Sequence, residues 1–223
     1  MVPIDDDYRK TLWSCTTPSE FLGHYNYGNA FYSFVHGIAH IVVLNSYTDT
    51  SIGSIQYNWL QEELERNVDR TVTPWLLVIF HCPLHTTFIG HNNEKNSKNM
   101  LESMEPLFVK YHVNIVVSGH DHAYMRTHSM IGNKLDVFGN GPIYFTLGAG
   151  GNREEHSKGY IHRKPEPWVA KRDNYEYGFG NLFLANQTHA HFSWVRDGTT
   201  ERGIQDDVWL KNQLLFPSTT VIP

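Results

Sequence analysis

The chain has 223 residues, of which 40% are hydrophobic, 18% charged and 13% aromatic. This composition excludes a disordered chain, which needs few aromatic residues and a high charge density. The net charge of −5 gives no electrostatic reason to expect a nucleic-acid partner, and no apolar run approaches the roughly 18 residues that a membrane span needs.

Strands and helices alternate over the first half of the predicted structure. Runs of β-branched and aromatic residues predict four strands, at 31–35, 38–44, 75–80 and 113–117. Apolar residues at helical spacing predict two helices, at 54–67 and 99–111. This order favours an α/β fold in which helices cover a face of a sheet.

The second half of the chain is predicted to be rich in strands and loops. Further strands are expected at 142–147, 182–185, 189–195 and 208–210, and loops at 84–97 and 148–159. Residues 1–29 are rich in turn-forming residues and predict an irregular lead-in, in which no signal peptide is visible.

Histidine is the residue type that points to chemistry. The chain has 14 histidines, and histidine is the commonest metal ligand. His81 directly follows one buried strand, and His120 and His122 follow the next. Because ligands of open α/β sheets bind beyond the carboxyl ends of the strands, we expect these three imidazoles in one crevice, within reach of a metal.

A second His-x-His pair and the two cysteines carry less information. His189 and His191 lie inside a predicted strand and are expected to be solvated or packed. Cys15 and Cys82 allow one disulfide at most. Cys82 follows a buried strand, so we expect a packed core cysteine rather than a metal ligand.

An ordered series of segments resembles the purple acid phosphatases, which are binuclear members of the calcineurin-like metallophosphoesterase superfamily. The segments are AFYSFVHGIAHIVVLNSYTD at 30–49, VIFHCP at 78–83, SGHDHAYMRT at 118–127, GPIYFTLGAGGN at 141–152 and NQTHAHFSWVRD at 186–197. The likeness covers about residues 30–211, and Met125 stands where the family usually has glutamate.

The resemblance implies a fold and a domain assignment. The expected fold is the layered α-β-β-α sandwich of the metallophosphoesterases, truncated at its N-terminal side. Residues 30–223 would be the C-terminal part of the catalytic domain, with a strand-rich segment at 142–212.

The resemblance also implies an activity, the hydrolysis of phosphate monoesters at acidic pH. The family uses Fe(III) with a divalent ion, which is Zn, Mn or Fe(II). His81 and His120 would bind the divalent ion and His122 the iron, with the metals stabilising the charge of the transition state. In the family, histidines in the loop after the strand that ends at His81 hold the substrate and protonate the leaving group. This loop contains His85 and His91, and His91 lies closest to the matching position.

Location and assembly are implied only through the family. A secreted, vacuolar or lysosomal protein is expected, and a homo-oligomer is left open. Asn186 begins a glycosylation sequon that is used only if the chain is secreted.

The family's remaining metal ligands come from Asp-x-Gly, Gly-Asp-x-x-Tyr and Gly-Asn-His motifs, none of which occurs in the chain. Without their carboxylates and tyrosinate, three neutral imidazoles cannot offset the repulsion between two highly charged cations. We therefore expect the chain alone to bind at most one divalent ion such as zinc.

Three readings of the function follow from these absences. The favoured one is an N-terminally incomplete part of a phosphatase. The first alternative is a degenerate relative, a catalytically dead pseudo-phosphatase or binding module on the same scaffold. The second is a mononuclear zinc hydrolase that uses His81, His120 and His122 alone.

Overall fold

The computed structural model describes residues 15–16, 30–197 and 203–215, which form two sheets and two helices. The strands of the main sheet are β1 (Cys15–Thr16), β2 (Tyr32–His36), β3 (Ala39–Val43), β4 (Trp75–Ile79), β5 (Ile115–Ser118), β6 (Tyr124–Ile131), β7 (Lys134–Leu135), β8 (Ile143–Leu147) and β9 (Val169–Asp173). The small sheet contains β10 (Gly178–Leu184), β11 (His189–Arg196) and β12 (Gly203–Lys211). The helices are α3 (Ile55–Arg66) and α4 (Lys95–Lys110).

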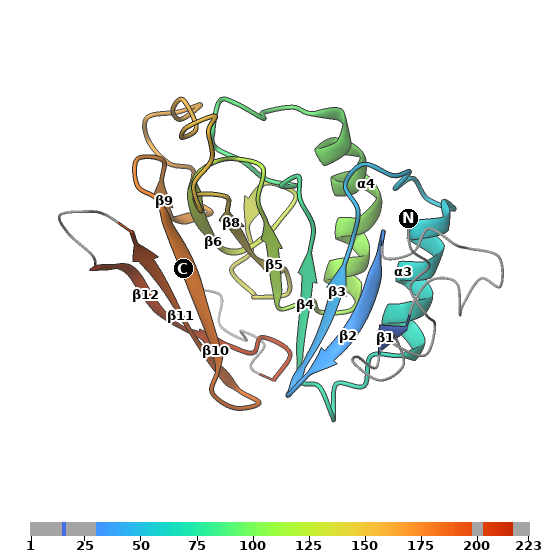
Figure 1. Ribbon diagram of the computed structural model, residues 1–223. Helices are drawn as coiled ribbons and strands as arrows, with labels where there is room; N and C mark the ends of the chain where they lie inside the picture. The colour runs from blue at the N-terminus through green and yellow to red at the C-terminus, as the bar shows by residue number, and fades with distance from the viewer. Residues whose placement is uncertain (1–14, 17–29, 198–202, 216–223) are drawn as a thin grey trace, which may run out of the picture.

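Parallel strands form the centre of the main sheet. β3, β4, β5 and β8 lie side by side in this order, while β2 and β6 pair antiparallel at either side. The chain crosses from β3 to β4 through α3 and from β4 to β5 through α4, and both helices cover the same face (Figure 1). The carboxyl ends of β4 and β5 therefore meet at one edge of the sheet.

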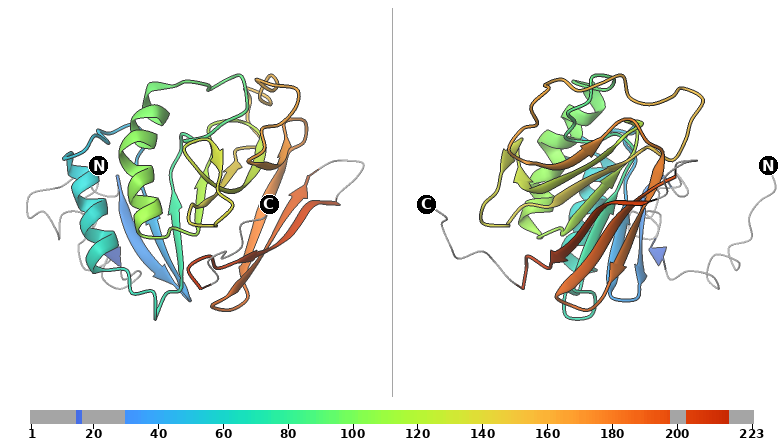
Figure 2. Two further views of the ribbon diagram at one scale, coloured as in Figure 1. Left: turned by 180° about the vertical axis from the view of Figure 1, so that it is seen from behind. Right: turned by 90° about the vertical axis from the view of Figure 1, so that its left-hand side faces the viewer.

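Alternating side chains of the strands fill two separate cores. Leu76 and Val78 of β4 pack toward the helices, whereas Trp75 and Leu77 point to the opposite face and pack with residues of the small sheet such as Phe192. The period of two residues along a strand produces this division. The described residues thus form three layers, one of helices and two of strands (Figure 2), which confirms the predicted α/β architecture.

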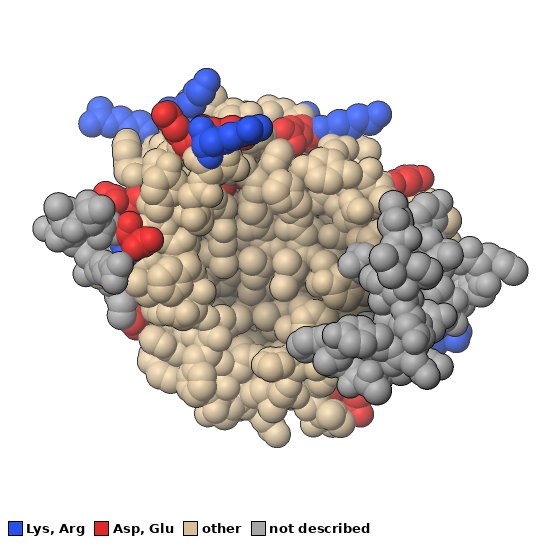
Figure 3. All heavy atoms as spheres, in the orientation of Figure 1, with Lys and Arg blue, Asp and Glu red and all other residues tan. Residues whose placement is uncertain are grey.

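Charged side chains are unevenly distributed over the molecule. Figure 3 shows most of the Lys and Arg side chains of this face along its upper rim, on the side where β4 and β5 end, while the middle of the face is uncharged. Neither helix among the described residues is long and apolar enough to cross a bilayer.

The helix predicted at 54–67 is confirmed at both ends. Ser54 is the N-cap, and its hydroxyl accepts a hydrogen bond from the backbone N–H of Tyr57 at 3.2 Å. Asn67 is the C-cap. Trp59, Leu60 and Leu64 are buried on the sheet side, so the local capping signal and the apolar stripe agree with the tertiary packing.

The second helix begins earlier than predicted, at Lys95 rather than 99, which corrects the end of the loop predicted at 84–97. Residues 95–98 read Lys-Asn-Ser-Lys and contain no apolar residue. The periodic signal therefore starts only at Met100, one turn after the backbone has become helical.

Several strands lie where no periodicity was found. β6, β7 and β9 were not predicted, and β10 and β12 are longer than the strands expected at 182–185 and 208–210. β6 is flanked by β8 and β9, and its polar Arg126 bonds to Asp206 of the small sheet. Tertiary partners rather than local alternation stabilise this strand.

The cysteine and N-terminal predictions have different outcomes. Cys82 is fully buried with a free thiol, so it is the expected core cysteine and the disulfide is not formed. Residues 15–16 form β1 against β2, which corrects the irregular lead-in at this point. The rest of 1–29 lies outside the described residues. The sequon residue Asn186 lies in the turn between β10 and β11.

Candidate metal centre and active site

His81 and His120 meet because β4 and β5 are neighbouring parallel strands. The two loops that leave these strands are joined by a backbone hydrogen bond from Gly119 N–H to His81 O, at 3.0 Å. The side chains then place His120 Nδ1 3.1 Å from His81 Nε2. Two nitrogen ligands at about 2.0–2.1 Å from a tetrahedral zinc ion lie about 3.3 Å apart, so this pair matches the spacing of ligands on one ion.

A tight turn presents His120. Its φ is +64°, in the left-handed region, and Asp121 N–H and Ala123 N–H donate to the carbonyls two residues earlier at 2.8 and 2.7 Å. Gly148 closes the turn from behind, because a Cβ there would lie 2.0 Å from Asp121 O. Contact with the backbone of the candidate site therefore requires a glycine at position 148, in the segment after β8.

Replacing Gly148 by alanine is expected to destabilise the protein by about 1–3 kcal/mol or more, because the new methyl group overlaps a backbone carbonyl that cannot rotate away. Chemical denaturation measures the change. Gly150→Ala is the matched control, since a Cβ at Gly150 meets nothing within 4 Å and its φ is not positive. Equal stability of the two variants would show that the turn does not rest against Gly148.

His122 is oriented by a different set of contacts. Its Nδ1 lies 2.8 Å from the carbonyl oxygen of Glu155, which only accepts hydrogen bonds, so Nδ1 carries the proton. In the neutral tautomer that this contact selects, Nε2 carries the lone pair, and Asn152 Nδ2 lies 3.5 Å from it. A backbone carbonyl that fixes the tautomer in this way is typical of histidines that bind metal. Among the described residues, His122 is hydrogen-bonded to Glu155 and Asn152 rather than to His81 or His120.

Glu94 is a functional candidate that sequence reasoning missed. Its carboxylate accepts from His91 Nδ1 at 2.7 Å and from His120 Nε2 at 3.0 Å. The ring of His91 lies over that of His120, with 3.7 Å between the ring centroids. His91, the predicted catalytic histidine, is thus brought to the His81–His120 pair. The signal in the sequence that could have identified Glu94 is its position three residues after His91, a histidine of the same predicted loop.

Charge and solvation keep the imidazole of His81 in its ligand form. Loss of solvent around the ring, and then repulsion from nearby His120 and His91, lower the pKa of His81. Burial alone would raise the pKa of Glu94, but hydrogen bonds from His91 and His120 hold it below its ordinary value. A neutral imidazole beside an ionised carboxylate is the protonation state that binds a divalent cation.

Two further groups border the candidate site. Cys82 Sγ, a carboxylate oxygen of Glu94 and a ring nitrogen of His120 all lie within 4.8 Å of one another. Burial raises the pKa of Cys82, and a protonated thiol is a poor ligand. Asp121 is fully buried and accepts a hydrogen bond from Thr86 Oγ1 at 2.5 Å, while its Oδ1 has no hydrogen-bond partner in the described part of the chain. Burial raises the pKa of Asp121, against the hydrogen bond from Thr86.

The other histidines considered lie elsewhere. His85 is buried and bonds to Glu105 Oε1 and Asn133 Oδ1, both at 2.7 Å, so it belongs to the packing behind the loop. His191 bonds to Asp207 on the outer strand β12 at 2.8 Å. The expectation that this second His-x-His pair is solvated or packed is thereby confirmed for His191.

The donor set among the described residues fits one divalent ion. It offers ring nitrogens of His81 and His120, with His122 nearby, and the carboxylate of Glu94, whose pKa is lowered. Zinc accepts such a mixture of nitrogen and oxygen ligands. Two highly charged cations held a few ångströms apart need bridging carboxylates to offset their repulsion, and the described residues of this cluster do not supply them.

Family comparisons match most of the chain. The calcineurin-like phosphoesterase family matches residues 8–124, and the family described as iron/zinc purple acid phosphatase-like protein C matches residues 141–206. Together they cover the ends of β4 and β5 and the strand-rich segment that follows.

Relatives and a solved structure agree with these matches. Probable purple acid phosphatase 20 of Arabidopsis thaliana is 40% identical over 194 residues, which are 86% of this chain and 44% of that protein. The Fe(3+)-Zn(2+) purple acid phosphatase 12 of the same plant is 34% identical, over 82% of this chain and 40% of that protein. The structure of purple acid phosphatase PPD1 from yellow lupin superposes with a TM-score of 0.68 at 20% identity, over 86% of this chain and 36% of that one. The chain therefore spans less than half the length of these relatives.

Proposed function

Because the chain belongs to the purple acid phosphatase family of calcineurin-like phosphoesterases, we propose that it contributes the histidine side of a metal centre that hydrolyses phosphate monoesters. The observation that carries this proposal is the 3.1 Å separation of His81 Nε2 and His120 Nδ1 at the ends of two adjacent parallel strands. The two ring nitrogens lie within hydrogen-bond distance of each other, and their separation is also that of two nitrogen ligands on one ion.

Each residue of the cluster has a distinct task in this proposal. His81 and His120 hold the divalent ion, and Glu94 orients His120 through Nε2. In a two-metal centre with the family's other ligands, His122 would provide the iron ligand that the family resemblance predicts. A bound metal ion supplies Lewis-acid stabilisation of the phosphate and a nucleophilic water at low pH. On the described residues alone the centre holds one divalent ion.

His91 is proposed to protonate the leaving oxygen. Its Nδ1–H donates to Glu94, so its Nε2 is the nitrogen that can deliver a proton to substrate. The carboxylate stabilises the charged imidazolium, and the ring's place over His120 puts this proton next to the metal-binding nitrogens. These contacts support a role of His91 as the acid for the leaving ester oxygen.

Replacing His91 by alanine is expected to lower kcat for phenyl phosphate by about 100-fold or more, the range of a lost general acid. The kcat for p-nitrophenyl phosphate should fall less, because its leaving group needs little protonation. Zinc affinity should remain unchanged. His36→Ala, an exposed histidine at the end of β2, is the control. Equal losses on the two esters would contradict the role of His91 as an acid.

The binding-module reading leads to a different result in the same assay. Zinc bound at His81 and His120 without turnover of either ester would favour it. Turnover with a single zinc per chain and no iron would favour a mononuclear hydrolase. Secretion or vacuolar location, and glycosylation of Asn186, stay predictions of the sequence.

A further inference from the structure

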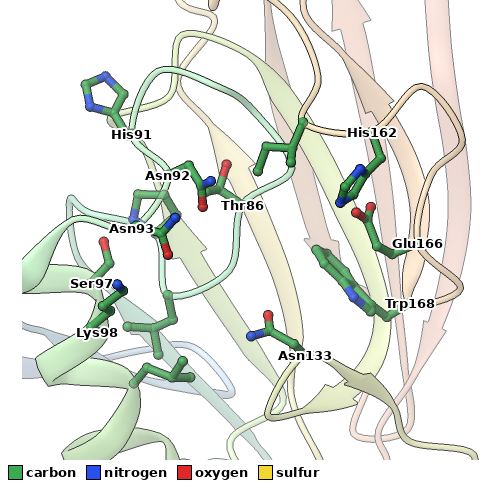
Figure 4. Close-up of a pocket in the computed structure, with 14 residues that line it drawn as sticks. Thr86, His91, Asn92, Asn93, Ser97, Lys98, Asn133, His162, Glu166 and Trp168 are labelled. Carbon is green, nitrogen blue, oxygen red and sulfur yellow. The ribbon is translucent and has the colours of Figure 1, made fainter.

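A pocket of about 450 Å³ opens beside the candidate metal centre. It shares His91 and Thr86 with that centre, and Thr86 hydrogen-bonds Asp121, the residue that follows His120. Figure 4 shows Asn92 and Asn93 on one side, Glu166 and Trp168 on the other, and Asn133 at the base. A group attached to a phosphate held at His81 and His120 would extend into this space.

The walls of the pocket combine apolar and polar side chains and are close to electrically neutral. The apolar part of the lining comes from Pro83, Leu84, Leu101, Ile161 and Trp168. Three asparagines contribute, at 92, 93 and 133, with one cation, Lys98, and one anion, Glu166. An amide side chain both donates and accepts hydrogen bonds, as a hydroxyl group does. A pocket with three amides and balanced charge therefore suits a neutral alcohol with several hydroxyls better than a hydrocarbon or a second phosphate.

Asn133 is held in place by a buried network. Its Oδ1 lies 2.7 Å from Nδ1 of His85, whose Nε2 lies 2.7 Å from Glu105 Oε1. Glu105 also accepts from Tyr144 OH at 2.8 Å and from Gly132 N–H at 3.0 Å. The side chains of His85 and Glu105 are 0% and 7% exposed. The network therefore fixes Asn133, an exposed turn residue with φ +61°, at the base of the pocket.

We propose that this pocket binds the alcohol part of the ester and that the preferred substrates are monophosphates of polyhydroxylated alcohols such as monosaccharides. This inference rests on the proposed function. In the reaction, water adds to phosphorus and the bond from phosphorus to the ester oxygen breaks. The departing sugar oxygen takes the proton from His91 and becomes a hydroxyl group, while the attacking water releases one proton to solvent, from which His91 is protonated again. Binding energy from the hydroxyls stabilises the reacting geometry at a distance from the bond that breaks.

The kinetic test compares glucose 6-phosphate with n-hexyl phosphate, two primary alkyl esters with six carbons. The metal-loaded protein is expected to prefer the sugar ester by at least about tenfold in kcat/KM, since a site built to bond hydroxyls rejects the analogue that lacks them. Asn133→Gly removes the amide and suits the positive φ, and should reduce the preference chiefly through KM. Asn92→Ala, on the opposite wall, provides a second variant. Asn140→Ala, an exposed asparagine outside the pocket, should leave the preference unchanged.

A binding readout separates this inference from the proposed function. Glucose 6-phosphate is expected to shift the side-chain amide NMR signals of Asn92 and Asn133 whether or not it is hydrolysed. Amide shifts without hydrolysis of either ester would support the pocket and refute the phosphatase proposal. Equal kcat/KM for the two esters, or no amide shift, would overturn the assignment of the pocket.

Discussion

Replacing His120 by alanine is expected to lower zinc affinity by at least about 100-fold and to remove phosphate ester hydrolysis. Loss of a group that only orients a ligand costs 10–100-fold in metal affinity, and loss of a ligand costs at least as much. His120 faces His81 with Nδ1 and is oriented by Glu94 through Nε2, so its removal leaves His81 without the second imidazole of the pair. Competition with a chromophoric chelator measures the affinity.

The matched control for His120 is His191→Ala. His191 also bonds to a carboxylate, that of Asp207 at 2.8 Å, but on the outer strand β12. Its removal should leave zinc affinity and turnover within twofold, or about 0.4 kcal/mol, of the wild type. An equal loss of affinity in the two variants would mean that zinc binds unspecifically to surface histidines.

The largest effect on stability is expected at Asp206, which joins the small sheet to β6. Its carboxylate accepts from Arg126 Nε at 2.8 Å, Arg126 Nη2 at 3.0 Å and Tyr124 OH at 2.6 Å. The side chains of Arg126 and Asp206 are only 13% and 9% exposed. Asp206→Ala leaves a buried guanidinium without its partner and should cost about 3–5 kcal/mol in the free energy of unfolding.

The neighbouring aspartate supplies the control. Asp207 has a 50% exposed side chain, and its carboxylate bonds to His191. Asp207→Ala should change the free energy of unfolding by no more than about 0.5 kcal/mol. Similar values for the two aspartates would show that the ion pair between the sheets contributes little.

The contribution of Asp206 depends on pH in a defined direction. Burial would raise the pKa of Asp206, but hydrogen bonds from Arg126 and Tyr124 hold it below its ordinary value. A lowered native pKa means that the stabilisation is complete above the unfolded value of about 3.9 and is lost as the pH falls through the native value. The stability difference between wild type and Asp206→Asn should therefore shrink below about pH 4.

Much of the fold could be predicted because its signals are local. The helix at 55–66 has a serine cap and an apolar stripe, and the strands at 75–79 and 115–118 are continuous apolar runs. β6 and β9 could not be predicted, because β6 contains Arg126 and Thr127, whose burial depends on partners more than 15 residues away. Such strands are stabilised by pairing rather than by their own pattern.

The same distinction applies to the candidate site. The proximity of His81 and His120 could be predicted, because residues that follow adjacent parallel strands meet at one sheet edge. Glu94 was missed because it reaches His120 only through the path of the loop after β4 and the first turn of α4. The pocket at Asn133 depends on the hairpin turn between β6 and β7, which a buried glutamate holds from another element.

The most direct test of the metal centre is X-ray absorption spectroscopy of the chain loaded with one equivalent of zinc. Shared binding by His81 and His120 predicts a nitrogen shell at about 2.0–2.1 Å with the multiple scattering of at least two imidazoles. His120→Ala should weaken that scattering. A first shell of oxygen alone, or a sulfur shell at about 2.3 Å from Cys82, would contradict the proposed histidine centre.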